Sequence, residues 1–218
     1  MSARYRTAIA VWRAWHGTQH ATLGALGVAV LHLWSGPIEV PGRDDVAQMV
    51  WPLAPTLLAL ACLTGSRTAM GPSERITPRG AAAVRAGYLL ALGCFGASLL
   101  VASGPIADAR VVARNDAFLC GLALLAAEVL PASAAWVPVV VVPMAMWLLG
   151  SNGLGSAPEP WAVLLEPAGS TAAARVASGT LLAGAGCYLA RPGFTEVQRT
   201  LLRRRGPDRR VSGARSGR

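Results

Sequence analysis

Lysine is absent from this 218-residue chain, so every basic side chain is an arginine. Charged residues make up only 14% of the sequence, well below the quarter that is typical of soluble domains. A soluble fold of this length must cover its core with polar side chains, and long stretches of the chain lack them. With 53% hydrophobic residues and a mean hydropathy of +0.44, the composition is typical of a chain that lies partly in lipid.

Cysteine is also scarce, and its placement excludes a disulfide framework or a zinc site. The four cysteines lie one by one inside apolar stretches, with no CxxC or His/Cys spacing. The sequence has no GxSxG, HExxH or GxxxxGK[ST] motif, so it lacks the signatures of serine hydrolases, zinc peptidases and P-loop ATPases. We therefore expect no enzyme activity and no bound cofactor or metal.

Six apolar stretches follow one another along the chain. Residues 86–103 and 134–150 show no polar face at helical period, as a helix on a soluble bundle would. Helices that are apolar all round belong in lipid, where about 20 residues cross the hydrocarbon. We therefore predict an all-α polytopic membrane protein with about six transmembrane helices, the first and fourth of which need their polar flanks to reach full length. The predicted spans are residues 21–34, 46–64, 86–103, 117–130, 134–150 and 171–190.

Both ends of the chain differ from this central part. On a helix, Tyr5, Ile9, Trp12 and His16 fall near one stripe, which predicts an amphipathic interfacial helix over residues 1–20. Residues 193–218 form a basic cytoplasmic tail: it has helical character from Phe194 through Leu202, and the arginine-rich end after Leu202 predicts a disordered segment that binds anionic membrane lipids. No aromatic residues alternate with these arginines, so we expect no nucleic-acid partner. The transmembrane domain then covers residues 21–192.

The arginines predict the orientation of the chain. Sixteen of the 20 lie before the first span, between the second and third spans, or after the sixth. Because cytoplasmic loops are rich in basic residues, six spans with both termini cytoplasmic in a bacterial inner membrane fit this distribution. Arg110 and Arg114 lie on the opposite side and run against the rule.

The loop before the last span is unusually apolar. Trp161, Leu164 and Leu165 lie between Pro160 and Pro167, in a segment too short to cross a membrane. We predict a short helix here, and two placements stay open: a re-entrant element in the outer leaflet, or a surface helix packed on its neighbours.

Ionisable residues inside a membrane are costly and are therefore functional candidates. Glu128, near the cytoplasmic end of the fourth span, and His32, in the first span, are the two that we single out. For Glu128 a structural contact with headgroups or a loop arginine competes with a gating or proton-carrying role. Asp116 is expected to cap the fourth span. The pair Gly93 and Ala97, and the run Gly179, Gly184 and Gly186, predict close approach of the third and last spans to other helices.

The layout resembles the membrane subunits of type-2 ABC exporters. The features that carry the resemblance are the N-terminal segment RYRTAIAVWRAWHG, the six spans with both ends inside, and the apolar segment PEPWAVLLEPAGS before the last span. The resemblance implies that the chain is one half of a permease that pairs with a like subunit, as a homo- or heterodimer. It also implies a separate ABC-class ATPase, docked on the cytoplasmic segment 66–85, and an amphipathic or lipid-like substrate. The coupling arginines would then be Arg67, Arg75, Arg79 and Arg85.

Two other classes of function stay open from the sequence. A membrane scaffold or regulatory protein would use its basic tail to recruit a partner and would have no ATPase. An ion-coupled secondary transporter would use Glu128 and is expected to contain internal repeats, of which the sequence shows no convincing pair.

Overall fold

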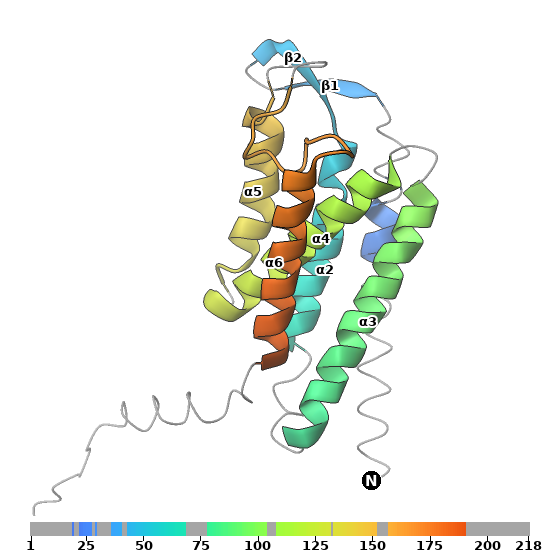
Figure 1. The fold of residues 1–218 in the computed structure, drawn as a ribbon, viewed down its shortest axis with the longest axis vertical. Coiled ribbons are helices and arrows are strands. Elements are labelled where there is room, and N and C mark those ends of the chain that lie inside the picture. The colour runs from blue at the N-terminus through green and yellow to red at the C-terminus, as the bar shows by residue number, and fades with distance from the viewer. Residues whose placement is uncertain are drawn as a thin grey trace, which may run out of the picture.

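Among the residues that the structure describes, five α-helices of 14 residues or more alternate in direction along the long axis, and a two-stranded β-hairpin lies at one end (Figure 1). This computed structural model describes residues 19, 22–27, 29, 36–40, 43–68, 78–103, 108–131, 133–151 and 157–190. Its helices are η1 (Trp51–Leu53, a 3-10 helix), α2 (Pro55–Thr68), α3 (Pro78–Ser103), α4 (Ala109–Val129), α5 (Trp136–Leu149) and α6 (Thr171–Ala190). The all-α class predicted from the sequence is therefore confirmed.

The predicted spans agree with the helices to different degrees. α6 has the predicted bounds of the last span, and α5 differs from the fifth by two residues at its start and one at its end. α3 begins eight residues before the third span. Of the first span, residues 22–27 and 29 are helical, whereas the predicted interfacial helix and the basic tail lie outside the described residues, as does His32. Within the part of the chain that the structure describes, no helix combines the length and the hydropathy needed to cross a membrane.

The start of α4 corrects one prediction. Asp108, not Asp116, caps the helix: its carboxylate accepts a hydrogen bond from the Arg110 N–H at 2.8 Å. The helix therefore begins eight residues before the predicted span and includes the polar side chains of Arg114 and Asn115. Hydropathy does not predict the start of α4, because these polar side chains have hydrogen-bond partners in another part of the fold.

The hairpin corrects a second prediction. β1 (Pro37–Val40) and β2 (Arg43–Met49) pair antiparallel, with Pro37 opposite Met49. Part of the predicted second span, residues 46–49, is therefore strand. The 3-10 helix η1 follows the strand, and α2 begins at Pro55, where proline is tolerated because the first N–H groups of a helix have no partner within it.

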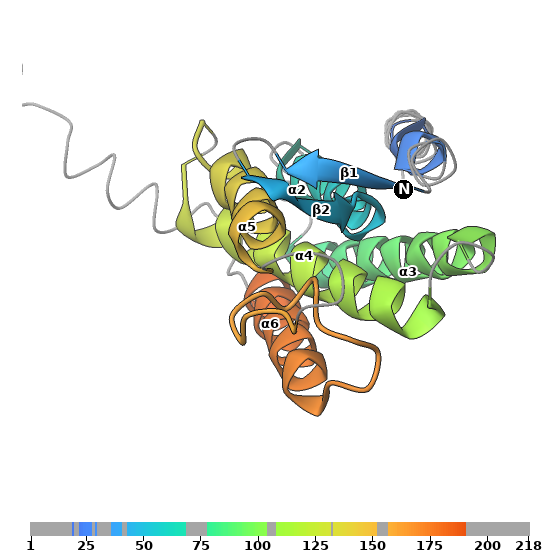
Figure 2. The same cartoon turned by 90° about the horizontal axis from the view of Figure 1, so that it is seen from above.

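Helix α4 occupies the centre of the bundle, in contact with α2, α3, α5 and α6 (Figure 2). Its closest neighbour is α6, because glycines meet where the two helices cross. A Cβ on Gly121 would lie 2.5 Å from the backbone nitrogen of Leu181, and one on Gly184 would lie 2.5 Å from the carbonyl oxygen of Gly121. The close approach predicted for the glycines is therefore confirmed at Gly184, whereas a Cβ on Gly93, Gly179 or Gly186 would meet nothing within 4 Å.

The hairpin is fastened to the bundle by one tryptophan. Trp147 of α5 is buried, packs with Val40 and Val50, and donates a hydrogen bond from Nε1 to the carbonyl oxygen of Met49 at 2.8 Å. Such a bond contributes about 0.5–1.5 kcal/mol net. Trp147→Phe should lower the free energy of unfolding in mild detergent by about that amount, or somewhat more because the ring is also smaller. Trp161→Phe is the matched control, since that side chain is exposed, and an equal loss in both variants would contradict the role of the hydrogen bond.

Candidate functional site

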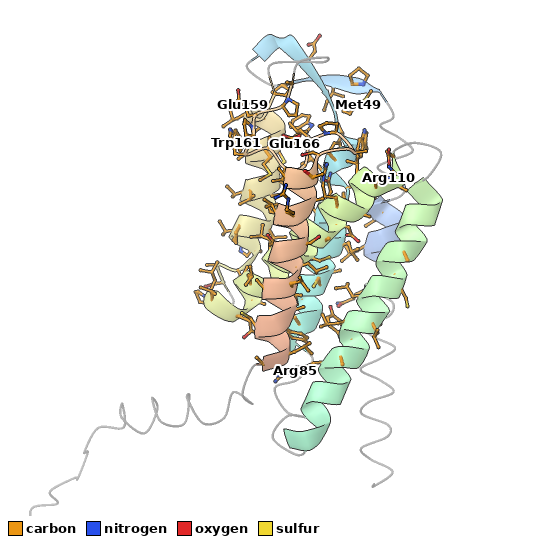
Figure 3. All side chains as sticks on the ribbon, in the orientation of Figure 1. Met49, Arg85, Arg110, Glu159, Trp161 and Glu166 are labelled. Atoms are coloured by element: carbon orange, nitrogen blue, oxygen red, sulfur yellow. The ribbon has the colours of Figure 1, made fainter. Side chains whose placement is uncertain are left out.

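Several polar and aromatic groups gather at the end of the bundle that carries the hairpin, called here the hairpin end. Figure 3 shows Met49, Arg110, Glu159, Trp161 and Glu166 there, and Arg85 at the opposite end. The hairpin end also contains the first turns of α4 and α6 and the segment of residues 157–170, which leads into α6. This segment is the one that the sequence singles out as apolar.

Residues 157–170 form consecutive turns rather than the predicted short helix. Hydrogen bonds of 2.8 and 2.9 Å join Ala162 N to the Glu159 carbonyl and Leu165 N to the Ala162 carbonyl. Prolines at 160 and 167 leave too few residues between them for a helix to repay its costly first turn. The segment still packs onto the bundle end: Leu164 is buried, Leu165 is partly buried, and Trp161 is 46% exposed. Its placement in the outer leaflet stays a prediction.

Two consecutive residues of α4 hold this segment by its backbone. The Arg114 guanidinium donates to the carbonyl oxygens of Pro167 at 3.0 Å and Leu164 at 3.5 Å. The Asn115 amide nitrogen donates to the same Leu164 oxygen at 3.0 Å, and its oxygen accepts from Arg114 Nε and Nη2 at 3.2 and 3.1 Å. Both side chains are buried. The carbonyl groups that they bind belong to no helix or sheet. Because Arg114 and Asn115 hold the segment through these groups, we call the two residues the latch.

A glycine brings the end of α5 against the same segment. A Cβ on Gly150 would clash with the Cβ of Ala162 and with the carbonyl oxygen of Met146. The Gly150 carbonyl in turn accepts from Glu159 N at 2.8 Å. The segment is therefore fixed on one side by α5 and on the other by the latch of α4.

The sequence alone did not single out the latch. Arg114 stood out only as a basic residue on the wrong side for the charge rule, and its buried role in the fold removes that anomaly. The sequence shows an Arg-Asn pair at the start of an apolar helix. Such a pair does not by itself indicate which groups the two side chains bind.

At the opposite end, Arg85 joins α3 to the end of α6. Its side chain is 2% exposed, and Nη1 donates to the carbonyl oxygen of Tyr188 at 3.3 Å. The guanidinium carbon lies 5.9 Å from the centre of the Tyr188 ring, within the range of a cation–π interaction. Tyr88 adds an edge-to-face contact with Tyr188, at 6.3 Å between ring centres, and its hydroxyl donates to the Cys62 carbonyl of α2 at 3.2 Å. We call Arg85, Tyr88 and Tyr188 the Arg85 junction.

The other predicted site residues lie apart from one another. Arg67 is in the last turn of α2 and Arg79 in the first turn of α3, while Arg75 lies outside the described residues. Glu128 is in the last turn of α4 and partly buried. The structure therefore brings together Trp161, Leu164 and Leu165, but places Glu128 at the far end of α4 from them.

One carboxylate inside the bundle was not singled out as an intramembrane group. Asp116 lies about two turns into α4, and its Oδ1 accepts a weak hydrogen bond from Cys120 Sγ at 3.8 Å. Its Oδ2 occupies space that a Cβ on Gly96 would need, 2.6 Å away, so glycine at that point of α3 makes room for the acid. The sequence placed Asp116 at the helix boundary because the true start of α4 was missed.

Comparison with known proteins adds no relative: no family model, curated protein or solved structure matches this chain. Among the described residues, no group of three or more His, Cys, Asp or Glu side chains is arranged to hold a metal ion. The function proposed for this chain therefore has to be argued from its sequence and from the geometry of the two bundle ends.

Proposed function

We propose that this chain is a multi-pass membrane subunit of an ATP-driven exporter, forming half of the translocation path. The observation that carries the membrane placement is the contrast between the sides of the bundle and its ends. Large apolar side chains are exposed along the sides, among them Leu90 of α3 at 71% and Leu182 of α6 at 73%. Exposed apolar surface on this scale is unfavourable in water and favourable against acyl chains.

Charged side chains have the complementary distribution. Among the described residues, those that are exposed all belong to the hairpin end or the first turns of α4 and α6: Glu39, Asp108, Arg110, Glu159 and Arg175. Exposed tryptophans lie near both ends, Trp161 in the hairpin-end segment and Trp136 at the start of α5, where its Nε1 donates to the Ser133 carbonyl at 2.8 Å. Exposed charges confined to an end, apolar sides and tryptophans near both boundaries are typical of a membrane-embedded bundle.

The direction of the helices supports the orientation. Because they alternate, the end of α2, the start of α3 and the end of α6 all lie at the end opposite the hairpin (Figure 1). Most of the arginines belong to these parts of the sequence, so the end with the Arg85 junction is the cytoplasmic one in this proposal.

The exporter assignment adds a partner at that cytoplasmic end. The resemblance to type-2 ABC exporters places the ATPase on segment 66–85, which ends at Arg85. A movement of this segment would reach α6 directly, since Arg85 is bonded to the Tyr188 carbonyl. In this proposal the Arg85 junction positions the helices and takes part in no chemistry.

Co-purification from the native host in mild detergent tests this proposal. We expect an ABC-class ATPase to come down with the tagged chain in equimolar amount. Replacing Arg75 and Arg79 by alanine should reduce its yield several-fold, whereas replacing the exposed Arg110 and Arg175 by alanine, the same loss of two charges at the hairpin end, should not. A chain that purifies without an ATPase, or an equal loss in both variants, would overturn the exporter assignment.

A second candidate, an ion-coupled carrier, is favoured by the Asp116 carboxylate inside the bundle. Acids within transmembrane segments commonly form part of ion or proton paths. This candidate predicts that Asp116→Asn abolishes transport by a chain that purifies alone, and that Asp108→Asn, a change in the exposed cap, leaves transport intact. Loss of activity in both variants, or in neither, would contradict it.

A further inference from the structure

We infer that residues 157–170 are a movable cover over the hairpin end, and that Arg114 and Asn115 are the latch that holds it closed. The inference rests on the proposed function in one respect: the cover would close the outer end of the translocation path until the substrate leaves. Its physical basis lies in the bonds that attach the cover to the rest of the fold.

The cover is attached to α4 through atoms that can change partner. Its acceptors are the carbonyl oxygens of Leu164 and Pro167, and every donor in the latch belongs to α4. The Glu166 carboxylate, which belongs to the cover, attracts Arg114 electrostatically, but the hydrogen bonds of Arg114 to the cover are to the neutral carbonyls of Leu164 and Pro167. A charged donor that is bonded to neutral carbonyls is held less strongly than one in a bidentate ion pair. Water at the surface of the bundle can replace those carbonyls when the cover lifts.

The cover leads directly into α6, so the hydrogen bonds between the cover and the latch depend on the position of α6 relative to α4. Ser170 accepts a hydrogen bond at Oγ from Ala173 N, which caps the first turn of α6 at 3.3 Å. A shift of α6 along α4 would therefore carry the Pro167 carbonyl away from Arg114. Because Gly121 contacts the backbone of α6, side-chain rotation cannot absorb such a shift. One whole helix must move against the other.

Site-specific thiol labelling of the full chain in mild detergent tests the latch. The exposed Cys94 and Cys187 are replaced by serine, and Leu164→Cys serves as the reporter, because Leu164 is 1% exposed. A maleimide is added and each cysteine is followed by mass spectrometry. With the latch intact, we expect Cys at 164 to react slowly, whereas Trp161→Cys, measured separately, reacts fast because that position is exposed.

Arg114→Gln is expected to raise the labelling rate of the Leu164→Cys reporter about tenfold or more, since hydrogen bonds from a charged donor are lost. Asn115→Ala should act in the same direction. Arg110→Gln is the matched control: it removes the same charge one turn earlier on α4, from an exposed side chain, and should leave the rate unchanged.

Two results would overturn the inference. The first is a labelling rate in Arg114→Gln no higher than in Arg110→Gln. The second is equally raised labelling of the buried Cys62 and Cys120, which would mean that the pair holds the whole fold rather than the cover. Neither readout involves an ATPase, so a failed co-purification would remove the exporter assignment and leave the latch standing.

Discussion

Gly121→Ala is expected to destabilise the protein by about 1–3 kcal/mol, because overpacked helix contacts must separate to accept an extra methyl group. The atoms in its way are the backbone nitrogen of Leu181 and the backbone carbon of Thr180, each 2.5 Å from the new Cβ. A flexible side chain could rotate away from this position, but backbone atoms cannot. The free energy of unfolding in mild detergent is the measurement.

Gly179→Ala and Gly186→Ala are matched controls on α6. A Cβ at either position meets nothing within 4 Å, so each variant should be neutral or more stable by up to about 1 kcal/mol, the helix-propensity gain of alanine over glycine. A loss of stability in the controls as large as that of Gly121→Ala would show that glycine itself, rather than the α4–α6 contact, matters.

Tyr188→Ala is expected to have the largest effect of the single substitutions, a loss of about 3–5 kcal/mol typical of a buried aromatic residue. Tyr188 is 1% exposed and touches both other members of the Arg85 junction. Its removal leaves a cavity between α3 and α6 and takes the aromatic ring away from the buried Arg85 guanidinium. Both changes act in the same direction on the free energy of unfolding.

Leu189→Ala is the control for this variant, because the neighbouring side chain is 41% exposed and loses far less contact. Tyr188→Phe keeps the ring, and should therefore keep most of the stability. If Leu189→Ala and Tyr188→Ala proved equally destabilising, the junction would not be the cause of the loss.

The helical class was predictable because several long stretches are apolar all round, with turn residues between them. The bounds of α6 were predicted to the residue, since Pro167, Gly169 and Ser170 mark its start, and arginine and proline follow Ala190. The hairpin was missed because its strands are short and its register depends on pairing between residues 37–40 and 43–49, which a hydropathy window does not detect.

The latch was missed for a related reason. Arg114 and Asn115 read as part of a polar loop, and only the return of residues 157–170 to the same end of the bundle gives them buried partners. The apolar character of that returning segment was visible in the sequence, but its hydrogen-bond partners lie some 50 positions away in the chain. Local patterns carry no information about such a pairing.

The central position of α4 bears on the order in which the chain assembles during synthesis. Its contacts with α2 and α3 involve segments made before it, whereas its closest neighbour, α6, is the last helix of the described chain. The glycine surface at Gly121 must therefore stay uncovered until α6 has been synthesised, and residues 157–170, which lead from the α5 side to α6, are made just before it. The hairpin end of the bundle is thus completed by the same step that completes its core.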